Sequence, residues 1–170
     1  FLKIDVNLST LLFLKAGNNM FYINLFELVT QTIVESLAFT FTATVFLKVK
    51  IRKPTILTIG LINGILIYLI RKIPMAFGFH TIFSIFFMTV LLYYFYSKSS
   101  LNCFIVSLKV FIILTIFELF FSYSILFLTD INIDLIQSKP YIKTLVMLPQ
   151  IIFLFLTGFF IWYKQNLKGD

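Results

Sequence analysis

The residues that could do chemistry in this 170-residue chain are few, and most of them lie within or beside long apolar stretches. The single histidine, His80, and the single cysteine, Cys103, bracket one apolar segment from opposite ends. At helical rise they are about 24 Å or more apart, which is too far for a nucleophilic dyad. A metal site would need further ligands, and the sequence offers no second histidine and no carboxylate near His80. We therefore expect no catalytic residue, no metal, no cofactor and no enzymatic activity, and His80 is interpreted as a helix N-terminal residue or a gate at a cavity mouth.

Polar side chains recur on one face of the first long apolar stretch. An ionisable group at the centre of a bilayer costs about 2.5–3.5 kcal/mol, so such groups need a structural or functional reason. At 100° per residue the five polar residues fall within roughly an 80° arc. This stripe predicts either packing contacts with neighbouring helices or a dimer partner, or the lining of a ligand cavity, with a proton or ion path as a third alternative. The stripe consists of Asn24, Glu27, Gln31, Glu35 and Thr42.

Further charged groups lie beyond the stripe. Glu118 and Lys109 fall on opposite faces of one apolar segment and cannot pair with each other, so Lys109 is expected to snorkel and Glu118 to need a partner from another helix. Arg71, in the segment "LIRKIPMAFGFHT", lies at a depth where Glu27 can meet it, and we hypothesise a Glu27–Arg71 ion pair. The candidate ligand-binding residues are therefore Glu27, Gln31, Glu35, Arg71, His80 and Glu118.

The elements that must position these side chains are membrane helices. Only 12% of the residues are charged and 60% are apolar, whereas a soluble chain carries about 25% charged residues. Runs such as "IFSIFFMTVLLYYFY" do not alternate with the period of two that a membrane β-barrel requires. We predict an all-α fold, a polytopic integral membrane helical bundle of about five transmembrane helices. Their predicted ranges are 21–47, 55–70, 81–96, 103–129 and 144–163.

Loop cations predict how this bundle sits in the cell membrane. The densest cluster, "KVKIRK", holds four cations and should be cytoplasmic, and five crossings then place the C-terminus in the cytoplasm. The net charge of +7 is explained by loop cations that set topology and meet the lipid bilayer, so no nucleic-acid partner is expected. Residues 1–19 are expected to be a non-native or disordered extension, with the natural start at Met20. Residues 20–170 are expected to form a single transmembrane helical domain.

The motif "GLING" predicts how one of these helices packs. Its glycines, Gly60 and Gly64, form a GxxxG pattern inside an apolar segment, which favours close helix–helix packing. The alternative is dimerisation through the same face.

The order of three motifs carries a resemblance. "YLIRKIP" is followed by "FGFHT", and after a second apolar hairpin "LPQ" opens the last helix. In this order the chain resembles the N-terminal multi-helix sensor region of quorum-sensing-type histidine kinases of Firmicutes, of the sporulation and accessory-regulator kind, and small stand-alone membrane proteins that share this region. The resemblance implies a sensor that receives a peptide or envelope signal, forms homodimers and acts through a cytoplasmic kinase or regulator partner. The 170 residues contain no phosphotransfer helices and no ATP-binding domain, so kinase activity is not carried over.

Two classes of function therefore remain open. The first is a sensor-like or accessory membrane domain without its own catalytic module. The alternative is a small solute transporter or substrate-binding membrane subunit that holds a solute on the same polar stripe. No internal repeat is present in the sequence, so the pattern typical of many transporters is missing. A membrane protease is disfavoured because the Cys–His dyad and any zinc motif are lacking.

Overall fold

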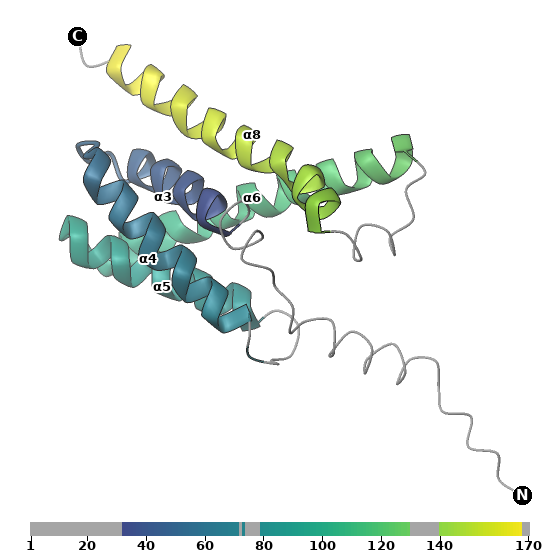
Figure 1. The fold of residues 1–170 in the computed structure, drawn as a ribbon. Helices are drawn as coiled ribbons and strands as arrows, with labels where there is room; N and C mark the ends of the chain where they lie inside the picture. Colours follow the sequence, from purple (N-terminus) through teal and green to yellow (C-terminus); the bar gives the residue numbers. More distant parts are fainter. Residues whose placement is uncertain (1–31, 72, 74–78, 130–139, 168–170) are drawn as a thin grey trace, which may run out of the picture.

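Five helices build the part of the chain that the computed structural model describes, which is residues 32–71, 73, 79–129 and 140–167 (Figure 1). These residues contain no strand, so the predicted all-α class is confirmed. The predicted N-terminal extension, and the part of the first predicted helix before residue 32, lie outside the described residues. The helices are α3 (Val34–Phe46), α4 (Lys53–Arg71), α5 (Phe79–Tyr96), α6 (Ser100–Thr129) and α8 (Pro140–Leu167).

The helix ends differ from the predicted ends by a few residues. α6 begins three residues earlier than predicted, and α8 is longer than the predicted range 144–163 at both ends. Pro140 occupies the first helical position of α8, where its fixed φ suits a helix and its missing N–H would be unpaired anyway. Pro149 lies within α8 without ending it, as membrane helices tolerate when neighbouring groups compensate the lost hydrogen bond. Apolar runs therefore located the helices well but did not locate their polar ends.

Helix length and hydropathy identify a membrane protein. Three helical segments are long and apolar enough to cross a bilayer: Lys53–Arg71, Ser100–Phe121 and Met147–Leu167. The apolar segments Val34–Phe46 and Thr81–Tyr96 are shorter. The 13 residues of α3 extend only about 20 Å, less than the hydrocarbon thickness of about 30 Å. The described part of α3 lies inside the bundle, in contact with α4, α6 and α8.

α3 is the central helix of the bundle. It packs against α4, α6 and α8, while α5 packs against α4 and α6 (Figure 1). Most of its side chains are buried, including several threonines. The hydroxyls of Thr40 and Thr44 donate to the carbonyl oxygens of Ser36 and Thr40, each at 2.8 Å, so the helix satisfies its own buried hydroxyls. Thr42 instead donates to the carbonyl oxygen of Leu154 in α8, at 3.1 Å.

Glycines allow the close approach of α3 and α4. A Cβ on Gly60 would lie 3.1 Å from the Cα of Leu37, and one on Gly64 would lie 3.3 Å from the Cα of Ile33. Both neighbours belong to the polypeptide segment that leads into or forms α3. The predicted packing role of the GxxxG motif is therefore confirmed, and its partner lies within the same chain.

The outer surface of the bundle is apolar, unlike that of a soluble protein, and its interior mixes apolar with polar side chains. The interior holds several polar side chains, among them Thr42, Asn63 and Gln150, each at most 3% exposed. The outward faces of α4, α6 and α8 carry large apolar side chains, such as Ile65, Ile116 and Phe160. An apolar surface of this extent is stable in lipid and not in water.

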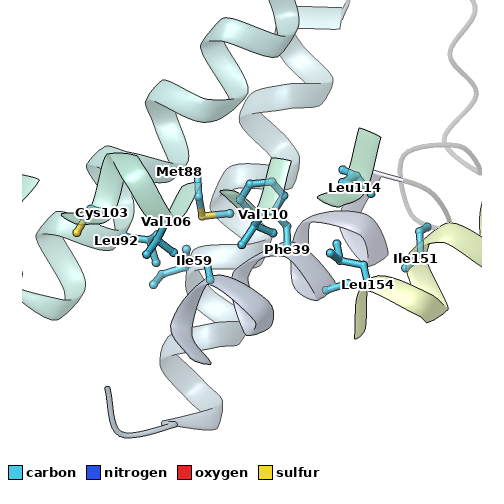
Figure 2. Close-up of a cluster of buried hydrophobic side chains, with 12 residues drawn as sticks. Phe39, Ile59, Met88, Leu92, Cys103, Val106, Val110, Leu114, Ile151 and Leu154 are labelled. Carbon is cyan, nitrogen blue, oxygen red and sulfur yellow. The ribbon is translucent and has the colours of Figure 1, made fainter. Parts of the chain in front are cut away.

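The apolar core lies where α3 meets its neighbours (Figure 2). Phe39 of α3 contributes the central ring, and Met88, Val110 and Leu154 come from α5, α6 and α8. Cys103 is fully buried in this cluster as a free thiol. This core fixes the five helices on one side of a polar cavity, which lies nearer to the start of α3.

Candidate functional site

A polar cavity of about 120 Å³ lies between the five helices. The lining comes from the first turns of α3 and α5, the first half of α8, the second half of α4 and the middle of α6. The cavity is thus in one half of the bundle, away from the loop 47–52 and the C-terminal end of α8. Its lining residues are Thr32, Glu35, Ser36, Phe39, Asn63, Ile67, Arg71, Thr81, Ser84, Phe111, Leu114, Glu118, Met147 and Gln150.

An ion pair links two helices at this cavity. Nη2 of Arg71, in the last turn of α4, lies 3.9 Å from Oε2 of Glu35, in the first turn of α3. Nη1 of Arg71 donates to the hydroxyl of Thr32 at 3.4 Å. Both charged side chains are partly exposed, 29% for Arg71 and 19% for Glu35. At 3.9 Å the pair is a loose one, so both charges keep hydrogen-bonding capacity for another group.

The carboxylate observed beside Arg71 belongs to the predicted polar stripe. Glu27 lies outside the described residues, so the Glu27–Arg71 hypothesis is not addressed there. Within the described part of the chain, the carboxylate beside Arg71 is that of Glu35, from the same predicted polar stripe. The observed pair therefore uses one residue of the stripe, and the Glu27–Arg71 pair stays a prediction.

Asn63 is the most deeply buried polar residue of the cavity wall. It lies between the two glycines of α4, is 1% exposed, and its Nδ2 donates to Oγ of Ser36 at 2.8 Å. Its Oδ1 has no hydrogen-bond partner among the described residues. An unpaired buried carbonyl oxygen costs about 1–3 kcal/mol, so the site is set up to accept a hydrogen bond. Sequence reasoning missed Asn63 because "GLING" drew attention to its glycines; a buried amide in an apolar helix was the available signal.

Two further polar side chains enter the cavity from α6 and α8. Glu118 lines it, and no ion pair joins Glu118 to any of the described residues. Gln150 is 3% exposed and also lines the cavity. Gln150 belongs to the "LPQ" motif, which was noticed for its resemblance and not proposed as a site residue. Of the six predicted site residues, the structure thus brings Glu35, Arg71 and Glu118 to one cavity.

The remaining predicted residues are placed only in part. Glu27 and Gln31 lie outside the described residues. His80 lies in the first turn of α5, and its side chain is outside the described part, while the next residue, Thr81, lines the cavity. Thr42, at the far end of the polar stripe, is not in the cavity lining and serves packing against α8.

The cavity has the chemistry of a binding site. It offers two carboxylates and one guanidinium, together with amide and hydroxyl groups. Within the described residues, no three histidine, cysteine, aspartate or glutamate side chains lie close enough to hold a metal ion. The lining can therefore bind a small polar molecule by hydrogen bonds and charge.

The fold and this cavity define a class, that of helical integral membrane proteins with a polar interior cavity. No family model, curated protein or solved structure matches the chain. The argument for function therefore depends on the cavity itself.

Proposed function

We propose that this chain is a sensor-like integral membrane domain that binds a small polar ligand in its interior cavity and has no catalytic module of its own. The observation that carries the proposal is the Glu35–Arg71 ion pair beside an unpaired amide oxygen, inside a bundle whose outer faces are apolar. Charged groups within a membrane domain are costly, and ligand recognition is a common reason to keep them. Envelope or peptide signals, which the sequence resemblance implies, are sources of such a ligand.

The charge distribution supports an outward-facing cavity. Consecutive helices alternate in direction, so the loop 47–52, the turn 97–99 and the C-terminal end of α8 share one end of the bundle. Cations gather at that end, whereas the cavity lies in the other half. By the positive-inside rule the basic end and the C-terminus are cytoplasmic, and all five helices cross the plasma membrane. The cations are Lys48, Lys50, Arg52, Lys53, Lys98 and Lys164.

The lining also suggests the chemical nature of the ligand. Glu35, Glu118 and Arg71 together carry a formal charge of −1 at neutral pH, and Oδ1 of Asn63 needs a donor. A primary ammonium group supplies both the positive charge and the N–H donors. A dry cavity of about 150 Å³ holds one benzene molecule, so this cavity of about 120 Å³ fits a group of about five non-hydrogen atoms.

Binding of an ammonium group provides a route to a signal. A cation that binds Glu35 competes with Arg71 for the same carboxylate and loosens the link between the start of α3 and the end of α4. The ligand thereby favours one arrangement of these two helices over another, which is the requirement for any ligand-driven change. The output passes through a second copy of the chain or a cytoplasmic kinase or regulator partner.

Ligand-dependent stabilisation tests the proposal. The purified chain in nanodiscs is heated with methylammonium, butylammonium or glycinamide, and with neutral butanol as the isosteric control. The ammonium compounds should raise the unfolding midpoint in a concentration-dependent and saturable manner, since a ligand that binds only the folded state stabilises it. Glu118→Gln should abolish the shift. Lys109→Gln, which changes the charge on the same helix outside the cavity lining, should leave it intact.

Two results would overturn the proposal. Equal shifts with butanol and butylammonium would show that the cavity does not recognise charge. Saturable, counterflow-competent uptake of the bound compound into proteoliposomes would favour the transporter, whose solute site would be the same cavity between five helices.

A further inference from the structure

A second hollow lies at the basic end of the bundle, far from the polar cavity. It measures about 730 Å³ and separates the α3–α4 loop from the last turns of α8. Lys48, Lys50 and Lys53 line one side of it. Trp162 is the only tryptophan of the chain, and it lines the other side.

The loop that carries these lysines has a defined geometry. Lys48 has φ of 52°, and its N–H donates to the carbonyl oxygen of Val45 at 3.0 Å, which reverses the chain directly after α3. Nε2 of Gln165, in the last turn of α8, donates to the same carbonyl oxygen at 3.3 Å. The two walls of the hollow are thus joined at one point, and the spacing between the lysines and Trp162 is fixed by the fold.

The chemistry of the hollow suits a phosphate group. Its lining contains three ammonium groups, the amide side chains of Gln165 and Asn166, and no carboxylate. Ammonium and amide groups donate hydrogen bonds to phosphate oxygens. Six cations lie at this end and all are exposed, but three of them, Arg52, Lys98 and Lys164, lie outside the lining of the hollow.

The surroundings distinguish a lipid from a free phosphate. Along the face of α8 that carries Trp162, the apolar side chains of Phe155 and Phe159 are exposed on the outside of the bundle. The rings of Phe159 and Trp162 are in contact, with centroids 5.7 Å apart. Tryptophan is enriched at headgroup level, where its ring contacts both polar and apolar groups. A molecule with a phosphate in the hollow and acyl chains along α8 satisfies all of these contacts.

The geometry points to a binding site for the headgroup of an anionic phospholipid. The ammonium groups of Lys48, Lys50 and Lys53 contact the phosphate, the indole of Trp162 packs against the glycerol region, and the acyl chains follow the exposed face of α8. The site is separate from the polar cavity and does not depend on its ligand.

Trp162 fluorescence tests this site directly because the chain has no other tryptophan. The purified chain in phosphatidylcholine nanodiscs is compared at increasing fractions of phosphatidylglycerol, and the indole emission should change saturably. The variant Lys48→Gln/Lys50→Gln/Lys53→Gln should weaken the apparent affinity by about a hundredfold, since each lysine near anionic lipid contributes about a factor of five. The matched variant Arg52→Gln/Lys98→Gln/Lys164→Gln removes the same charge from the same end and should weaken the affinity less than the first variant, because these three side chains do not line the hollow.

Three outcomes would overturn the inference. Equal weakening in both triple variants would show diffuse attraction of a basic surface. A change in Trp162 emission that rises linearly with the phosphatidylglycerol fraction, without saturation, would also show diffuse attraction. Saturation by inorganic phosphate or glycerol phosphate at concentrations equal to those of the lipid would show a soluble phosphate site. Circular dichroism of each variant distinguishes lost binding from lost helical structure.

Discussion

Arg71 and Glu35 join the end of α4 to the start of α3 in the wall of the polar cavity, with 3.9 Å between Nη2 and Oε2. These helices also touch through Gly60 and Gly64, so the ion pair is the polar end of a longer apolar contact. Because both side chains are partly exposed, the pair is intermediate between a surface ion pair and a buried one. Its removal should therefore have a measurable but moderate effect.

Neutralising one partner of this pair should destabilise the bundle more than neutralising both. Arg71→Gln leaves the Glu35 carboxylate without its cation. We expect the free energy of unfolding to fall by about 1–2 kcal/mol, between the values for exposed and buried pairs. The double variant Arg71→Gln/Glu35→Gln should recover part of this loss. Unfolding in detergent, followed by circular dichroism, gives the four free energies of a double-mutant cycle. A coupling energy of zero would mean that the two charges act independently.

Adding a methyl group at Gly60 should separate α3 from α4. An alanine Cβ there would lie 2.5 Å from Cδ2 and 3.1 Å from Cα of Leu37, so Leu37 or the helix must shift. At Gly64 the nearest atom lies 3.3 Å away, which needs a smaller adjustment. Overpacking costs about 1–3 kcal/mol, and the better helix propensity of alanine offsets about 1 kcal/mol of it. Gly60→Ala, with the closer contact, should therefore lower the free energy of unfolding by up to about 2 kcal/mol, and Gly64→Ala should be close to neutral.

The measurement for these glycines is again detergent unfolding, with both variants in one series. If Gly64→Ala were the more damaging substitution, the contact of α4 with α3 would be closest at a different turn from that seen here.

Sequence patterns predicted the class of fold and one face of the site, but not the contacts across helices. Apolar runs located all five helices because a bilayer demands them, whatever the tertiary contacts. The polar stripe pointed to Glu35, yet the partner of Arg71 depends on where two helices lie relative to each other along the membrane normal. The periodicity of polar residues predicts which face of a helix they share, but it does not predict how deep each one lies in the membrane. Asn63 and Gln150 were missed because each is a single amide among apolar residues, whose role becomes visible only when the neighbouring helices are in place.

The hydroxyl of Thr42 should stabilise the contact between α3 and α8. It donates to the carbonyl oxygen of Leu154 on another helix, whereas Thr115 donates to Phe111 within its own helix. Hydrogen bonds between membrane helices average about 0.6 kcal/mol, with a maximum near 1.7 kcal/mol. Thr42→Val should therefore lower the free energy of unfolding by about 0.6 kcal/mol, and by about 1.7 kcal/mol at most. The matched isosteric change Thr115→Val should lower it less. Equal losses from the two variants would show that the interhelical bond adds nothing beyond a local one.

Cysteine labelling tests the orientation that both proposals use. Cys103 is the only cysteine and is fully buried, so Cys103→Ala gives a thiol-free background with little change in packing. Ser99→Cys then reports on the basic end, between α5 and α6, and Ile73→Cys reports on the cavity end, where Ile73 is 50% exposed.

In intact spheroplasts a membrane-impermeant maleimide should modify Ile73→Cys and not Ser99→Cys. After permeabilisation both should react. This result follows from the six cations at the basic end, since moving such a cluster across the membrane opposes the positive-inside rule. Labelling of Ser99→Cys alone in intact spheroplasts would invert the bundle and place the polar cavity in its cytoplasmic half. Labelling of both sites there would contradict the crossing of α5, whose apolar segment Thr81–Tyr96 is shorter than the three long spans.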